Sequence, residues 1–275
     1  MISPAISTRK RYRLSIALIL LCAAIVYLTG LDHAPLVDRD EPRYAQTSRQ
    51  MVQTNDWIVP RFLDEVRTAK PVLIYWVQAG TMRVLGDTVF AARLPSAIAM
   101  MLTLGLLAFV LPHVVGRTRS AWTVFVLSSC VMVFWSAKTC LTDAVLLLWI
   151  TIAQLCLYAA WRGRANWGVV ACWAIVTGLA VLTKGPVIFG VQGATLILLW
   201  IFGRKPLMRP SPIVSMSISN LLESAFARVA LFTIILCAIA GPWLFLVTQR
   251  EPTFLSRSIT HDVIGRATSA LENHW

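Results

Sequence analysis

The chain of 275 residues is 57% hydrophobic and only 14% charged, and its mean hydropathy is +0.68. About a quarter of the residues of a soluble domain are charged, so this composition excludes a soluble globular protein and indicates a membrane protein. The net charge of +12 does not indicate a nucleic-acid partner. The basic residues occur in short runs between apolar stretches, which is how membrane topology is encoded.

Seven apolar stretches are long enough, or nearly so, to span a membrane as helices. They are residues 14–31, 92–112, 120–137, 142–161, 166–182, 186–202 and 229–248. The first is longer than the apolar core of a cleaved signal peptide and is expected to remain as a span. Residues 71–86 are apolar but short, and Gln78 and Arg83 interrupt them, so a helix at the membrane surface is expected there. The expected fold is all-α and polytopic, with about seven transmembrane helices and surface-lying helices in the first outer loop.

The basic residues between these stretches fall on alternate connections, which predicts the sidedness of the chain. They are Arg9, Lys10, Arg11, Arg13, Arg117, Arg119, Arg162, Arg164, Arg204, Lys205 and Arg209. Residues 1–13 are therefore expected in the cytoplasm, and loop 32–91 on the opposite face with turns 138–143 and 183–186 and the segment after Gln249. The six cysteines show no CxxC spacing, so neither a disulfide nor a thiolate metal site is expected.

Three of the 13 acidic residues crowd into the first four positions of "DRDEPRYAQ", residues 38–46. They are Asp38, Asp40 and Glu41, and Arg43 and Tyr44 follow closely. Asp40 could be the N-cap of a short helix, which is the simpler interpretation of that residue alone. It does not account for the other two acids. A carboxylate cluster at the outer mouth of a helical bundle could also bind a cationic or hydroxylated ligand or act as a base.

Two lysines precede prolines that are expected to open helices: Lys70 in "AKPVLIYW" and Lys184 in "TKGPV". A lysine at a helix N-terminus favours binding of a phosphate, whereas a snorkelling lysine at the interface is the alternative. Asp143 could likewise be a helix cap, as could Thr142. His261 and Arg266 could be solvated loop residues. The topology nevertheless places six candidates on one outer face: Asp40, Lys70, Asp143, Lys184, His261 and Arg266.

Five motifs together carry a family resemblance: "DRDEPRYAQTSRQM", "NDWIVPRFLDEVRTAKPVLIYW", "ARLPSA", "LTDA" and "TKGP". In order and spacing they resemble bacterial protein mannosyltransferase-like glycosyltransferases of the GT-C superfamily, nearest to the aminoarabinose transferase branch that modifies lipid A. The resemblance covers residues 10–275. It implies an inverting enzyme of the bacterial inner membrane. Such an enzyme moves a sugar from a polyprenyl phosphate carrier to lipid A, or to a protein or glycan acceptor, on the periplasmic face.

The resemblance also implies roles for individual residues. The acids at the catalytic centre would be Asp40, with Glu41 beside it, and Asp143. The substrate- and phosphate-binding residues would be Arg43, Tyr44, Lys70, Lys184, His261 and Arg266. These roles agree with the chemistry, because a leaving phosphate needs positive charge and an acceptor hydroxyl needs a base.

Two departures from the family pattern stand out. Ala69 occupies the position before the motif lysine, where the aminoarabinose branch has a glutamate that pairs with a histidine to bind a metal ion. A lone His261 is a poor metal site, so no metal and no cofactor are expected. The chain also ends at Trp275, whereas relatives continue through further spans and a periplasmic domain. Residues 14–275 are thus expected to form the N-terminal part of a GT-C transmembrane domain.

Two other functions are compatible with a membrane protein that carries charged residues on one face. A transporter or flippase-like protein would show charges in mid-span and an inverted repeat with broken helices, and the sequence shows neither pattern. A truncated and inactive pseudo-enzyme is the other alternative, and activity of the purified chain would separate it from an enzyme.

Overall fold

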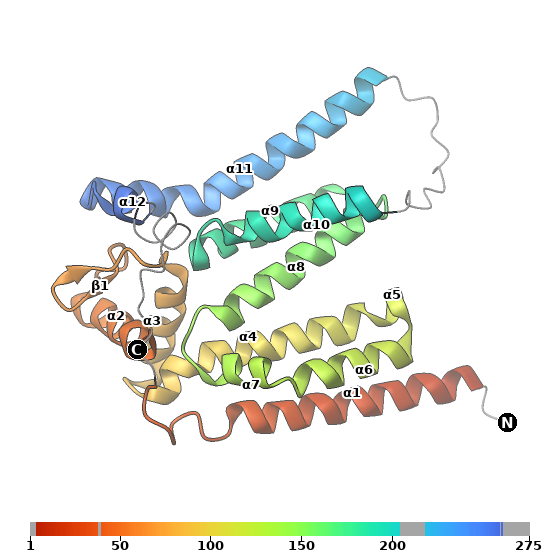
Figure 1. Ribbon diagram of the computed structural model, residues 1–275, viewed down its shortest axis with the longest axis horizontal. Coiled ribbons are helices and arrows are strands. Elements are labelled where there is room, and N and C mark those ends of the chain that lie inside the picture. Colours follow the sequence, from red (N-terminus) through yellow and green to blue (C-terminus); the bar gives the residue numbers. More distant parts are fainter. Residues whose placement is uncertain (1–3, 38–39, 204–217, 259, 261–275) are drawn as a thin grey trace. The chain divides into compact units, whose positions relative to one another are not determined.

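The structure, a computed structural model, describes residues 4–37, 40–203, 218–258 and 260 (Figure 1). It divides into two compact units. The first comprises Met1–Trp57, Arg61–Asp64 and Ile74–Leu148, and the second comprises Ile58–Pro60, Glu65–Leu73 and Trp149–Trp275. The division falls within α8 (Asp143–Trp161).

The described residues are almost entirely helical. The remaining helices of the first unit are α1 (Pro4–Leu28), α2 (Asp40–Thr54), α3 (Leu73–Leu85), α4 (Val89–Val110), α5 (Pro112–Val115), α6 (Arg117–Ser128) and α7 (Val131–Lys138). Those of the second unit are α9 (Trp167–Lys184), α10 (Val187–Phe202), α11 (Ile218–Arg250) and α12 (Phe254–Arg257). Two strands of two residues each, β1 (Arg61–Phe62) and β2 (Glu65–Val66), lie between α2 and α3.

The helices confirm an all-α, polytopic membrane protein. Five segments within the described residues are long and apolar enough to cross a membrane: Arg9–Leu28, Val89–Val115, Asp143–Trp161, Trp167–Lys184 and Ala225–Arg250. The bent pair of α6 and α7 could form a sixth, and α10 is apolar but has only 16 residues. All seven apolar stretches are therefore helical, and the number of seven spans stays a prediction.

The stretch 120–137, expected as one continuous helix, is broken between α6 and α7, whose axes differ by 59°. The hydroxyls of Ser128 and Ser129 each donate to the carbonyl of Phe125 at 2.8 Å. Serine hydroxyls that bond to carbonyls of the preceding turn favour a bend in a helix. The Tyr27 hydroxyl then donates to the carbonyl of Ser128 at 2.7 Å, which satisfies a carbonyl at the break.

Helix α3 packs inside the first unit, starting two residues later than expected, at Leu73 instead of Pro71. Ile74, Tyr75, Gln78, Ala79 and Met82 of this helix are buried. Their spacing of three or four residues forms one face of a helix. That face includes Gln78, the polar residue that interrupts the apolar pattern of the sequence. Its buried amide bonds to Ser48 and to the carbonyl of Cys140.

In the second unit, α9 and α11 lie side by side (Figure 1). They approach closely at Gly178, where an added Cβ atom would be 2.9 Å from Cγ2 of Ile239. The Trp243 indole of α11 donates to the carbonyl of Ile58 at 2.9 Å and packs edge-on against Phe254 at 5.6 Å. These contacts hold the 58–60 segment against α11 and α12.

Candidate functional site

A buried ion pair between Arg93 and Glu41 lies beneath the candidate site. Nε of Arg93 donates to Oε1 of Glu41 at 3.0 Å, and Nη2 donates to Oε2 at 2.8 Å. The other donors of Arg93 reach the carbonyls of Leu31, Ala34 and Pro35, each at 2.9 Å. All five N–H donors of the guanidinium are therefore bonded, which is the condition for burying this charge.

The Glu41 carboxylate is equally well bonded. Oε2 also accepts the backbone N–H of Val37 at 2.8 Å, and Oε1 accepts that of Cys140 at 2.9 Å. Burial acts to raise the pKa of Glu41, but the hydrogen bonds from Arg93, Val37 and Cys140, with the charge of Arg93, outweigh it and lower the pKa. Glu41 is thus a charged carboxylate whose two oxygens each accept two hydrogen bonds from the protein.

These bonds join the start of α2 to the turn before α8. Glu41 follows Asp40 directly, and Cys140 lies three residues before Asp143. The bond from Cys140 to Glu41 therefore links the first turn of α2 to the turn that precedes α8. Asp40 and Asp143 are both exposed at these two helix starts.

The structure does not place either aspartate at a cap position. Helix α2 begins at Asp40 itself, and α8 begins at Asp143, so each carboxylate lies in the first turn. Thr142, the residue before α8, is buried, and its carbonyl accepts the N–H of Leu146 at 2.9 Å. Acids in a first turn interact favourably with the helix dipole, and both side chains are exposed.

A second set of buried hydrogen bonds holds the turn before α8, at Cys140. The Ser48 hydroxyl of α2 donates to Oε1 of Gln78 at 2.8 Å, and Nε2 of Gln78 donates to the carbonyl of Cys140 at 2.8 Å. Ser48 and Gln78 are both fully buried. The backbone of Cys140 is thus held at its N–H by Glu41 and at its carbonyl by Gln78.

Three residues of the "DEPRY" motif differ in their surroundings. Tyr44, predicted to bind substrate, is 3% exposed and stacks on Tyr75 of α3 with ring centroids 5.7 Å apart. Arg43 is exposed, and its Nη1 lies 3.9 Å from Oδ1 of Asp40. An exposed pair at this distance contributes little to stability. Glu41, predicted as a catalytic acid, lies in the buried ion pair, so Asp40 and Arg43 are the charged residues of this motif that face outward.

The two predicted phosphate-binding lysines belong to the second unit. Lys70 is half-buried, and its Nζ donates to the carbonyl of Ala69 at 3.0 Å. Lys184 is the last residue of α9, and Gly185 ends that helix with a φ of +68°. Lys184 lies at the C-terminus of α9, where the dipole favours a cation, and also two residues before Pro186, the N-cap of α10. Its predicted role in phosphate binding stays a prediction.

His261 and Arg266 lie outside the described residues, and their predicted roles stay predictions. The side chain of Ala69 is a methyl group, which offers no ligand atom to a metal ion. Within the described part of the chain, no group of three or more His, Cys, Asp or Glu residues could hold one. The absence of a bound metal likewise stays a prediction.

Arg93 is the central residue to which the sequence assigned no role. It lies in the "ARLPSA" motif at the start of an apolar stretch. A charged residue among apolar ones needs a buried partner or a functional role, and that was the available signal. The spacing could not name the partner, because Glu41 is 52 positions away in the sequence.

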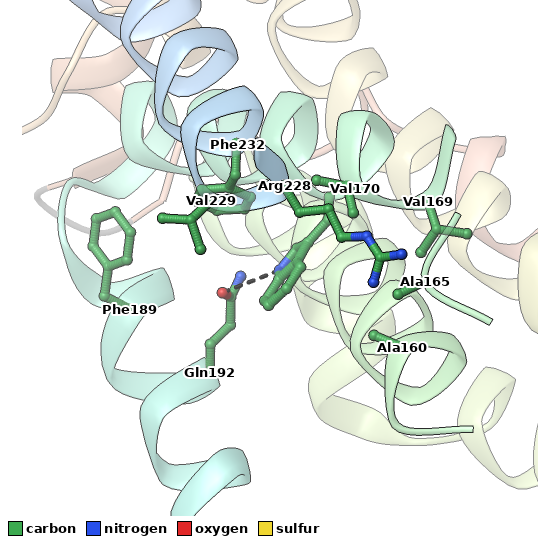
Figure 2. Close-up of a pocket in the computed structure, with 10 residues that line it drawn as sticks. Ala160, Ala165, Val169, Val170, Phe189, Gln192, Arg228, Val229 and Phe232 are labelled. Carbon is green, nitrogen blue, oxygen red and sulfur yellow. Dashed lines mark hydrogen bonds between the residues drawn. The ribbon is translucent and has the colours of Figure 1, made fainter. Parts of the chain in front are cut away.

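A separate cavity of about 340 Å³ lies in the second unit among α8, α9, α10 and α11 (Figure 2). Its lining is mostly apolar. The Trp173 indole donates to Oε1 of Gln192 at 3.1 Å, and Arg228 is one of the lining residues. None of the predicted site residues that the structure describes lines this cavity, so it is distinct from the candidate site.

Comparison with known proteins identifies the family. Residues 69–227, more than half of the chain, match the model of the family described as dolichyl-phosphate-mannose-protein mannosyltransferase. The chain belongs to this family. The resemblance expected from the five motifs is thereby confirmed.

The chain is also similar to curated proteins named undecaprenyl phosphate-alpha-4-amino-4-deoxy-L-arabinose arabinosyl transferase. It is 29% identical over 266 residues to the protein of Yersinia pestis, which covers 94% of this chain and 44% of that one. It is 27% identical to the second such transferase of Proteus mirabilis, over 86% of this chain and 41% of that one. The chain thus spans less than half the length of these curated relatives.

Solved structures show the same fold. ArnT from Cupriavidus metallidurans bound to undecaprenyl phosphate matches with a TM-score of 0.76 and 24% identity, over 90% of this chain and 44% of that one. The Pmt1–Pmt2 protein O-mannosyltransferase complex of S. cerevisiae matches with a TM-score of 0.63 and 17% identity, over 87% of this chain and 34% of that one. The GT-C architecture expected from the sequence is therefore confirmed.

The buried ion pair leads to a first prediction. Arg93→Met should lower the free energy of unfolding by about 3–5 kcal/mol, because it leaves the Glu41 carboxylate buried without a counter-charge. Arg43→Met removes an exposed arginine two residues from Glu41 and should change stability by less than about 0.5 kcal/mol. Thermal unfolding of both variants in detergent, followed by circular dichroism, measures the difference. Equal midpoints for the two variants would contradict a structural role of the pair.

The lowered pKa of Glu41 leads to a second prediction, on pH. A carboxylate whose pKa is lower in the folded than in the unfolded state stabilises the fold above its unfolded pKa of about 4.3. That contribution is lost as the pH falls through the folded pKa. The stability difference between the wild type and Glu41→Gln should therefore be largest near neutral pH and shrink below about pH 4.3. A difference that stays constant from pH 7 to pH 3 would show that the charge of Glu41 does not stabilise the fold.

Proposed function

We propose that this chain takes part in transfer of 4-amino-4-deoxy-L-arabinose from an undecaprenyl phosphate carrier to lipid A. The names of the curated relatives support the carrier and the sugar, and the family supports glycosyl transfer from a polyprenyl-type phosphate. The observation that carries the proposal is the exposed Asp40 carboxylate, 56% accessible, at the start of α2, next in sequence to Glu41, which is bonded to the turn before α8.

In the proposed reaction the bond between the anomeric carbon and the carrier phosphate breaks as the acceptor oxygen attacks from the opposite side. The phosphate leaves with the bonding electrons, and Lys70 with Arg266 would stabilise its charge. Asp40 would stabilise the positive charge that develops on the sugar ring, as carboxylates do in glycosyl transfer. Where the acceptor is a hydroxyl, Asp40 would also take its proton. An ionised phosphate acceptor has no proton to lose.

Asp143 would bind the amino sugar. A 4-amino-4-deoxy sugar is a cation near neutral pH, and an exposed carboxylate at the start of α8 complements that charge. We assign no catalytic part to Glu41, because its four hydrogen bonds and its ion pair already use both of its oxygens. In this proposal Glu41 positions Asp40 and Asp143 by linking the first turn of α2 to the turn that precedes α8.

We further propose that the protein lies in the bacterial inner membrane with loop 32–91 in the periplasm. The alternation of basic residues among the connections supports this orientation. Asp40 and Asp143 would then face the periplasm.

The proposed mechanism predicts different effects for two substitutions. Asp40→Asn should lower the transfer rate by about 100-fold or more and leave carrier affinity within about threefold, because only the charge at the reacting centre is lost. Lys70→Ala should weaken carrier binding and also slow transfer, because a cation beside the phosphate acts before and during bond breaking. Transfer of labelled sugar from its undecaprenyl phosphate carrier to lipid A, and carrier binding, are measured on the purified chain.

Asp64→Asn is the matched control for the first substitution, since Asp64 is an exposed acid of the same loop with no proposed role. An Asp40→Asn variant that is active within a few fold would remove Asp40 from the mechanism. A wild-type chain that binds the carrier and transfers no sugar would instead support the inactive pseudo-enzyme.

The proposed orientation predicts the accessibility of two introduced cysteines. Asp64→Cys and Arg164→Cys are made in a background without the six native cysteines, and both positions are exposed. An impermeant thiol reagent should label the first in intact spheroplasts and the second only after lysis. The reverse pattern would invert the orientation.

A further inference from the structure

An open groove of about 530 Å³ lies in the first unit between the N-terminal part of α1 and α6. One end of the groove is polar and carries Arg11, Ser15, Arg117 and Thr118. The next part is apolar and aromatic, with Ile19, Ala121, Trp122 and Phe125. The groove therefore has a cationic, hydrogen-bonding end and an apolar continuation.

A second hollow of about 420 Å³ continues along α1 and α6 and reaches the start of α7. It shares Ile19 and Phe125 with the first and extends past Cys22 to Val26 of α1. From Arg11 to Val26 the helix rises about 22 Å. One membrane leaflet with its headgroups is about 20–22 Å thick. The two hollows together thus have the length of a lipid that stands in one leaflet.

The walls of this groove are held by two tyrosines of α1. The Tyr12 hydroxyl donates to the carbonyl of Ala108 and shares a 3.0 Å hydrogen bond with Ser120 at the start of α6. Tyr27 donates to the carbonyl of Ser128 at the other end of α6. Because α1 is bonded near both ends of the groove, the hollow is part of the fold.

The two arginines have no acidic neighbour on the helices that surround them. The first acid of the chain is Asp32, and none occurs between Asp87 and Asp143. Helices α1, α4, α5, α6 and α7, which contact one another here, therefore carry no carboxylate at all. A counter-charge for Arg11 and Arg117 has to come from outside the helices that form and flank this groove.

We propose that this groove binds an anionic glycerophospholipid, with phosphatidylglycerol as the simplest example. Arg11 and Arg117 would hold the phosphate, since guanidinium groups bind phosphate oxygens with paired hydrogen bonds. The hydroxyls of Ser15 and Thr118 would bond the remaining headgroup oxygens. One acyl chain would lie along the apolar part of the groove past Ile19 and Phe125. Trp122, 64% exposed, would lie near the headgroup level, where tryptophan is enriched.

This groove is separate from the proposed reaction site. The arginines lie at the N-terminal part of α1, and the Arg93–Glu41 pair binds the segment after its C-terminus. Helix α1 rises about 26 Å from Arg11 to Leu28. A phosphate held by Arg11 and Arg117 is therefore too far from Asp40 to be the leaving group of the proposed transfer. The groove also extends over apolar surface that a free phosphate ion would leave empty.

The test compares two pairs of arginines on the same helices. Arg11→Gln with Arg117→Gln removes the groove cations. Arg13→Gln with Arg119→Gln removes two exposed arginines that do not line the groove, with the same change in net charge. Native mass spectrometry of the purified chain with added phosphatidylglycerol measures retained lipid. The wild type and the control should each retain one lipid, and the groove variant should bind it at least tenfold more weakly.

Trp122 provides a second readout, independent of charge. Phosphatidylglycerol with brominated acyl chains should quench the tryptophan fluorescence of the wild type more than that of Trp122→Phe. That difference should disappear in the variant with both groove arginines replaced. Size-exclusion profiles and helical circular dichroism of all variants establish that they are folded.

Four results would overturn the proposal. Equal loss of lipid in both double variants would show attraction by diffuse surface charge. Equal retention of phosphatidylcholine would show that the headgroup is not selected. Displacement by glycerophosphate alone would identify an anion site without a lipid tail. Displacement by an equimolar amount of undecaprenyl phosphate would identify the groove as a site for the carrier.

Discussion

The first unit depends on the buried pair of Arg93 and Glu41. Two charges can be kept away from water only when every donor and acceptor is bonded, and here five N–H groups and two carboxylate oxygens are. The bonds join four segments: the chain after α1, the start of α2, the start of α4 and the turn before α8. Loss of either charge would expose the other to an apolar interior, so these segments are held as one arrangement.

The geometry of a helix explains why neighbouring acids have different roles. Successive residues of an α-helix point about 100° apart. Glu41 points inward to Arg93, so Asp40, the residue before it, is left at the surface. Tyr44, three residues after Glu41, also points inward and stacks on Tyr75, whereas Arg43 is exposed. One face of α2 thus builds the fold, and the other presents a carboxylate and a guanidinium. The buried face of α2 thus fixes the position of the proposed reaction site in loop 32–91.

Helix α1 connects the two proposals within the first unit. The chain that follows its C-terminus supplies three carbonyls to Arg93, and its N-terminal part forms one wall of the groove with Arg11. A lipid bound in that groove would neutralise arginines that no acid of the surrounding helices can pair. It would also fill the space between α1 and α6 beside the break at Ser129. Lipid binding at one end of α1 and chemistry at the other would then be separate properties of one helix.

Hydropathy and the basic loops by themselves determined that this is an all-α membrane protein. In a bilayer the backbone polar groups of an apolar segment must bond within the protein, and a helix achieves this within one segment. The motifs determined the family and located Asp40 and Asp143 as candidates. Only the tertiary structure decided that Glu41 and Tyr44 are buried, that residues 120–137 bend, and that Arg93 is the central partner. Glu41 bonds residues 52 and 99 positions away. Local composition and spacing predict which residues can be charged or apolar, but the inward or outward direction of an acid is set by a partner brought to it from a distant part of the chain.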